Sequence, residues 1–125
     1  MTKRLLIIDD DSFIRDVLQA TLSRVAGWSV ITASSGVEAL ILVRSEGVDG
    51  ILLDISMPGM DGFMVFEQLQ ANSLTCKIPV ILLTAKAMSP DATQLVKMGF
   101  AGVIVKPFNP SILCTQISDL LGWQI

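Results

Sequence analysis

The chain has 125 residues, about one domain in length, and 51% of them are apolar against 17% charged, a balance that supports a folded core and argues against disorder. Nine basic and twelve acidic residues give a net charge of −3. This charge argues against direct binding of nucleic acid, because phosphate backbones require a basic face. No apolar run reaches the ~18 residues of a membrane span, and acidic residues interrupt the N-terminal run too early for a secretory signal. We therefore expect one cytoplasmic domain over residues 1–125, with no membrane insertion.

The chain contains no histidine and two isolated cysteines, Cys76 and Cys114. The lack of histidine excludes a Ser-His-Asp triad, a Cys-His pair and a His-ligated metal site. Neither cysteine belongs to a C-x-x-C pair, so we expect two free thiols rather than a zinc or redox site.

Five short β-rich runs alternate along the chain with segments of helical periodicity. Several of these runs are continuously apolar, as expected for strands that are covered on both faces. The expected strands are Arg4–Ile8, Trp28–Thr32, Gly50–Leu53, Pro79–Thr84 and Ala101–Val105.

Each run is followed by a segment with helical start and stop signals. Asp11 or Ser12 is the expected N-cap of the first helix. The second helix has its apolar stripe at Val37, Leu40 and Ile41, which we expect to face the core. The expected helices are Ser12–Val25, Ser35–Arg44, Gly62–Ala71, Asp91–Met98 and Asn109–Leu121.

Five βα units of this length predict an α/β fold with an open, doubly wound, five-stranded parallel sheet and helices on both faces. A closed eight-unit barrel would need about twice the chain. Open sheets of this kind bind their ligands at the carboxyl ends of the strands. The functional side chains are therefore expected directly after each strand.

Charged and hydroxyl side chains stand at four of these strand ends. Asp9 and Asp10 follow the first strand, Asp54 follows the third, Thr84 ends the fourth and Lys106 follows the fifth. Carboxylates this close together repel one another unless a counter-charge is present. The lysine supplies one positive charge, and an all-oxygen cluster suits Mg²⁺. Such a cluster could accept a phosphoryl group on one of its own carboxylates.

Four motifs lie in order at the expected strand ends and together cover nearly the whole chain. They are Leu5–Asp11 (LLIIDDD), Asp54–Gly62 (DISMPGMDG), Pro79–Ala85 (PVILLTA) and Val105–Phe108 (VKPF). With these motifs the chain resembles the receiver domain of response regulators in two-component signalling. The resemblance implies a flavodoxin-like fold with strand order 2-1-3-4-5.

The resemblance also implies roles for individual residues. Asp54 would be the phosphoacceptor, Thr84 the switch hydroxyl and Lys106 the phosphate-binding lysine. The phosphoryl donor would be a phosphohistidine on a separate histidine kinase or phosphotransfer protein, and the phosphorylated form would bind a downstream protein. Such a domain is not an enzyme in the usual sense, because it catalyses only its own phosphorylation and dephosphorylation.

A magnesium site is implied in the same way. Asp10, Asp54 and the backbone carbonyl of Ser56 would hold Mg²⁺, with Asp9 acting through water. Members of the family also often have a cis peptide bond before the proline that corresponds to Pro107.

The chain departs from the family pattern in two places. Val103 stands where the family usually has an aromatic residue, so we expect output through the Thr84–Lys86 loop and the helix after it. The last helix carries Asp119 as its only charge, which argues against dimers built on charged pairs and favours a monomer or weak dimer. Beyond this helix, Trp123 and Ile125 are expected to cap the core, and an exposed partner surface is the alternative.

Several residues and functions have alternative interpretations. Asp11 and Asp61 are expected to be helix caps rather than metal ligands, because helical segments follow them. A receiver that signals by contact without phosphorylation is one alternative function. A phosphatase of the haloacid-dehalogenase type is another, because Asp9 and Asp11 have the spacing of its nucleophile and acid/base pair. A flavodoxin-like phosphate cradle is excluded, since the acidic run would repel the phosphate.

Overall fold

All five expected strands form one parallel sheet in the computed structural model, which describes residues 2–55, 57, 59–85 and 92–123. The strand order is β2-β1-β3-β4-β5, as predicted. Each strand begins and ends within one residue of its expected bounds. The strands are β1 (Arg4–Ile8), β2 (Ser29–Ala33), β3 (Gly50–Asp54), β4 (Val80–Ala85) and β5 (Gly102–Lys106).

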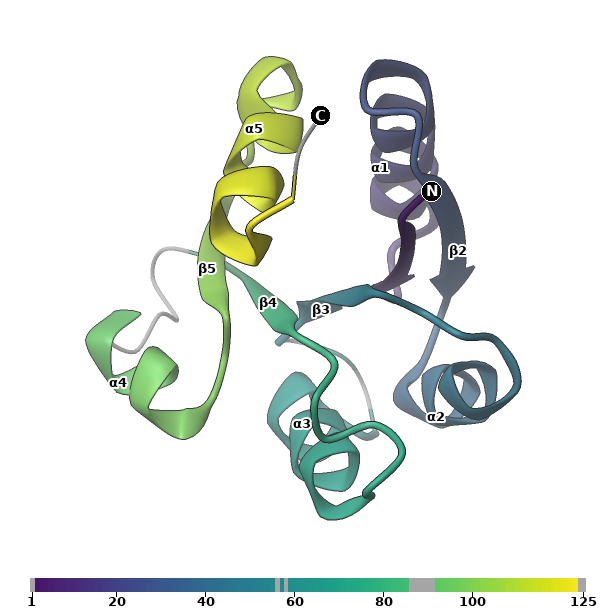
Figure 1. Ribbon diagram of the computed structural model, residues 1–125, viewed down its shortest axis with the longest axis vertical. Helices are drawn as coiled ribbons and strands as arrows, with labels where there is room; N and C mark the ends of the chain where they lie inside the picture. The colour runs from purple at the N-terminus through teal and green to yellow at the C-terminus, as the bar shows by residue number, and fades with distance from the viewer. Residues whose placement is uncertain (1, 56, 58, 86–91, 124–125) are drawn as a thin grey trace.

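Helices cover both faces of this sheet (Figure 1). Two of them, α1 and α5, pack on one face, and the other three pack on the opposite face. The helices are α1 (Ser12–Val25), α2 (Gly36–Ser45), α3 (Gly62–Ala71), α4 (Ala92–Met98) and α5 (Pro110–Leu121). None of the helices in the described ranges is long and apolar enough to cross a membrane.

The alternation of side chains along the central strands divides the core into two clusters. In β1, Leu5 and Ile7 pack with α1 and α5, whereas Leu6 and Ile8 pack with the helices of the other face. All four residues are fully buried or nearly so. Because side chains on both faces of the sheet are covered, the central strands have continuous apolar sequences rather than alternating ones.

The buried face of α2 differs in part from the predicted one. Val37 and Ile41 are 59% and 63% exposed, and the helix instead buries Gly36, Ala39 and Val43. The reason is the close approach of α2 to α3, since a Cβ atom on Gly36 would lie 2.6 Å from Cγ2 of Val65. A small residue is needed where the two helices pack this tightly, and Val37 and Ile41 face outward. Leu40, the third residue of the predicted stripe, does pack against the core.

The segment after α5 packs on the core, as expected. Trp123 contacts Trp28 edge to face, with ring centroids 5.2 Å apart, and the Lys3 ammonium lies 5.5 Å from the Trp123 ring. Ile125, the other expected capping residue, lies outside the described residues. Both cysteines are free thiols, which agrees with the prediction, and burial raises the pKa of Cys114.

The start of α3 is in direct contact with the backbone that follows Asp54. The Gly62 N–H donates to the carbonyl of Ile55 at 3.0 Å, and a Cβ atom on Gly62 would lie 2.5 Å from the backbone oxygen of Asp54. Asp61 caps the helix, as predicted, by accepting a hydrogen bond from the N–H of Met64 at 2.9 Å. Only glycine fits here, and this contact fixes the path of the chain just beyond β3.

We predict that Gly62→Ala destabilises the protein by about 1–3 kcal/mol, since the added methyl group would displace backbone rather than a flexible side chain. Urea unfolding measures this change. Gly47→Ala is the matched control, because a Cβ atom at Gly47 meets no atom within 4 Å. Equal stability of the two variants would contradict the close contact.

Candidate functional site

The register of the sheet places Asp9 and Asp54 side by side. Ile8 pairs with Leu53, so the residues that follow them, Asp9 and Asp54, stand at the same level of adjacent strands. Both carboxylates continue the side-chain alternation toward the face covered by α1 and α5. The parallel sheet therefore brings together two acidic residues that lie far apart in the sequence.

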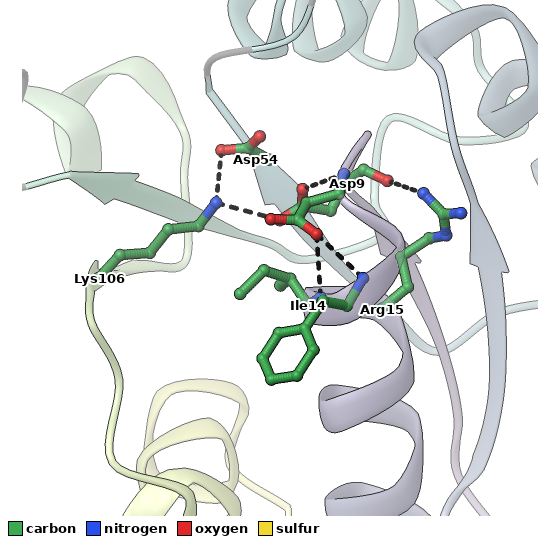
Figure 2. Close-up of polar contacts among 7 residues, drawn as sticks. Asp9, Ile14, Arg15, Asp54 and Lys106 are labelled. Carbon is green, nitrogen blue, oxygen red and sulfur yellow. Dashed lines mark hydrogen bonds and ion pairs between the residues drawn. The ribbon is translucent and has the colours of Figure 1, made fainter.

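Lys106 joins these two carboxylates from the edge strand of the sheet (Figure 2). Its Nζ atom lies 3.1 Å from Oδ2 of Asp9 and 3.1 Å from Oδ1 of Asp54. The lysine follows Ile104 by two residues and so lies on the same face of the sheet as both carboxylates. Its side chain thus reaches across β4, which separates β5 from β3. The peptide bond from Lys106 to Pro107 is cis.

Burial makes this three-residue contact strong. Asp9 and Asp54 are almost completely buried, and the Lys106 side chain is 25% exposed. Burial by itself would lower the pKa of Lys106, but the hydrogen bonds and negative charges of Asp9 and Asp54 outweigh it, so the pKa lies above its usual value. The ammonium group therefore stays charged throughout the neutral pH range.

Asp10 completes an acidic cluster at the surface end of this contact. One carboxylate oxygen each from Asp9, Asp10 and Asp54 lie within 4.8 Å of one another. Asp10 is exposed, and its side chain accepts no hydrogen bond within the described part of the chain. Within the described residues, these three carboxylates lie beside the ammonium group of Lys106, which leaves an excess of negative charge. This donor set fits a hard divalent cation such as Mg²⁺.

The loop between β1 and α1 is held by its own side chains. Oδ1 of Asp11 accepts hydrogen bonds from the N–H groups of Phe13 and Ile14, so this residue is a helix cap, as predicted. The Asp11 N–H donates to Oδ1 of Asp9 at 2.9 Å, and Nη1 of Arg15 donates to the backbone carbonyl of Asp9 at 2.8 Å. The sequence analysis did not single out Arg15. The sequence feature that could have indicated this contact is the position of Arg15, four residues beyond the helix cap Asp11 and after an acidic run.

Thr84 does not join the acidic cluster. Leu83 packs on the face of α1 and α5, so the next residue, Thr84, is directed to the opposite face from Asp54. Its buried hydroxyl donates to the backbone carbonyl of Ala85 at 3.2 Å. Ser56, which the resemblance places at the metal site, and Lys86, at the end of the expected output loop, lie outside the described residues. The structure thus brings together Asp9, Asp10, Asp54 and Lys106.

We predict that Lys106→Met lowers the free energy of unfolding by about 3 kcal/mol at neutral pH in the absence of divalent ions, because it removes the ammonium group that both buried carboxylates contact. Chemical denaturation in the presence of a chelator measures the loss. Lys77→Met, at an exposed lysine, is the control and should change stability little. A loss no larger than that of the control would show that the ion pairs contribute nothing to the fold.

Comparison with known proteins gives consistent results for sequence and structure. The model of the family described as "Response regulator receiver domain" matches residues 5–118. A chemotaxis protein CheY homolog from Campylobacter jejuni is 32% identical over 120 residues, which are 95% of this chain and 92% of that protein. The solved structure of chemotaxis protein CheY4 from Vibrio cholerae has a TM-score of 0.87 and 34% identity, covering 96% of this chain and 99% of that one.

Other relatives are longer proteins. The "Probable transcriptional regulator ycf27" of Porphyra purpurea is 37% identical over 119 residues, which are 95% of this chain and 47% of that protein. This chain thus spans about half the length of such curated relatives. On the family match, the three identities above 30% and the common fold, the chain belongs to the family of response regulator receiver domains of two-component systems.

Proposed function

We propose that this chain is a phosphoacceptor receiver in which Asp54 takes a phosphoryl group from a phosphohistidine on a histidine kinase or phosphotransfer protein. The observation that carries the proposal is the contact of Lys106 with both Asp9 and Asp54, 3.1 Å from each, beside the exposed Asp10. A buried carboxylate held next to a fixed cation is a suitable acceptor for a group that carries several negative charges.

In the transfer, a carboxylate oxygen of Asp54 forms a bond to phosphorus as the bond from phosphorus to the donor imidazole nitrogen breaks. The imidazole nitrogen keeps that electron pair. Lys106 is already within hydrogen-bond distance of Asp54, so its ammonium can neutralise charge on the phosphoryl oxygens without rearrangement. Receiver domains generally use Mg²⁺, which would be held by Asp10, Asp54 and the Ser56 carbonyl and by Asp9 through water, and would neutralise further phosphoryl charge.

Thr84 would connect the chemistry to a change of shape. Its hydroxyl is bonded to the Ala85 carbonyl and would have to leave that partner to reach a phosphoryl group on Asp54. The end of β4 would move with it, and the phosphorylated form would then present a different surface to a downstream protein. Val103 has no aromatic ring, so the Thr84–Lys86 segment and α4 would carry this output.

The phosphoryl donor would approach over an apolar hollow beside Lys106. Its volume is about 530 Å³, and it lies between α1 and the segment that joins β5 to α5. An apolar surface next to a charged site suits an amphipathic helix that carries the phosphohistidine. The residues that line the hollow include Phe13, Ile14, Val17, Pro107 and Phe108.

The phosphatase alternative has less support. It requires Asp11 to act as an acid/base two residues after a nucleophilic Asp9, but Asp11 caps α1 and Asp9 is bonded to Lys106. We accordingly propose that the chain turns over no external substrate, and that it acts in the cytoplasm as a monomer or weak dimer. Signalling by contact alone remains the alternative, and the experiment below tests it.

We predict that incubation with acetyl phosphate and Mg²⁺ adds one phosphoryl group, detectable as a gain in intact mass. The gain should be absent in Asp54→Asn and should fall at least tenfold without Mg²⁺, since the excess of negative charge would then repel the donor.

Asp16→Asn is the matched control, because it neutralises an exposed carboxylate on α1 outside the cluster. This variant should gain the group as the wild type does. A folded wild type that gains no mass would contradict the phosphoacceptor role and favour signalling by contact.

A further inference from the structure

Arg15 holds the backbone on both sides of Asp10. Its guanidinium Nη1 donates to the carbonyl of Asp9 at 2.8 Å, and its backbone N–H donates to the carbonyl of Asp11 at 3.1 Å. Figure 2 shows the side chain reaching back from α1 toward the end of β1. One residue thus fixes the carbonyl groups that flank the exposed member of the acidic cluster.

The three carboxylates of the cluster are oriented by different means. Lys106 donates to both Asp9 and Asp54, and the N–H of Asp11 donates to the other oxygen of Asp9. Asp10 accepts no side-chain hydrogen bond within the described ranges, so among these residues its carboxylate is placed by the path of its backbone. A contact that fixes this backbone therefore limits where the carboxylate can lie.

The Asp9 carbonyl makes the contact with Arg15 hard to replace. Asp9 is fully buried, and its N–H donates to the carbonyl of Ala33 in β2 at 3.1 Å. Arg15 is the donor to the Asp9 carbonyl within the described part of the chain. A buried carbonyl without a donor is costly, so loss of the guanidinium would favour rotation of the peptide between Asp9 and Asp10.

We propose that Arg15 is a positioning residue for the divalent cation, holding the Asp10 carboxylate where it meets those of Asp9 and Asp54. This role rests on the proposed function, because it concerns the cation of the same site. Residues that hydrogen-bond to metal ligands typically change metal affinity by about 10–100-fold when they are replaced. Arg15 bonds to the backbone of Asp9 rather than to a carboxylate, so we expect an effect at the lower end of that range.

The positive charge of Arg15, considered alone, predicts the opposite change in cation affinity when Arg15 is replaced. A guanidinium near a cation site repels the cation, so removal of that charge alone would tighten binding. If Arg15 orients Asp10, its removal weakens binding instead. The sign of the change in affinity therefore separates the positioning role from a merely electrostatic one.

The experiment measures Mn²⁺ binding to the unphosphorylated protein by electron paramagnetic resonance, with competition by Mg²⁺. We expect about tenfold weaker binding for Arg15→Gln and a smaller loss for Arg15→Lys, which keeps the charge and one flexible donor. Arg24→Gln is the matched control, since it removes the same charge from the exposed last turn of the same helix, and its affinity should equal that of the wild type.

A second readout is the Mg²⁺ dependence of phosphorylation by acetyl phosphate. In Arg15→Gln the half-saturating Mg²⁺ concentration should rise about tenfold, whereas the rate at saturating Mg²⁺ should be regained. A structural defect in Asp54 or Lys106 would lower that rate at every concentration.

Three results would overturn the proposal. The first is Mn²⁺ binding by Arg15→Gln that equals or exceeds that of the wild type. The second applies if thermal unfolding shows that Arg15→Gln does not fold, and it is an unchanged Mn²⁺ affinity of the folded Arg15→Lys. A folded wild type that binds neither Mn²⁺ nor Mg²⁺ would contradict both the metal site of the proposed function and the role of Arg15. If the wild type binds the cation and the Arg15 variants bind it equally well, only the role of Arg15 is contradicted.

Discussion

The repulsion among carboxylates at the carboxyl edge of the sheet is the constraint on which the rest of this structure depends. Asp9 and Asp54 are almost completely buried at the ends of adjacent strands, an arrangement that is unstable without a positive charge between them. Lys106 supplies that charge from β5, two strands away from Asp54 in the order of the sheet. The position of the edge strand is thus tied to the electrostatics of the central strands. Among the described residues, three carboxylates beside the ammonium of Lys106 still carry an excess of negative charge.

The site also needs rigid backbone on both sides of this cluster. On one side, Arg15 and the cap residue Asp11 fix the loop between β1 and α1. On the other side, Gly62 brings the first turn of α3 against the backbone of Asp54 and Ile55. Neither contact involves the carboxylate oxygens of Asp54. Both fix backbone that carries the acidic residues, which is how a small domain can hold several acidic groups in one arrangement.

Much of the fold could be predicted because its signals are local. Continuous apolar runs mark strands that are covered on both faces, and the residues directly after those strands form the cluster of Asp9, Asp10, Asp54 and Lys106. The sequence signals failed where a side chain's position depends on the distance between two helices or between a helix and a loop. The buried face of α2 is set by how closely α3 approaches Gly36, which periodicity does not reveal. The contact of Arg15 with the Asp9 carbonyl depends in the same way on the path of a loop.

The direction of the Thr84 side chain also follows from the alternation of side chains along β4. It affects how a change at the site would reach the protein surface. Thr84 is buried on the opposite face of the sheet from Asp54, and it pairs in register with Val105 of β5, which is partly exposed. Valine is small, and its β-branched side chain is restricted to few rotamers. Neither Val105 nor Val103 can therefore move a large group between core and solvent. Any displacement of Thr84 toward Asp54 would therefore move mainly the backbone at the end of β4. The output of this receiver would consequently depend more on the segment that follows β4 than on side chains of the edge strand.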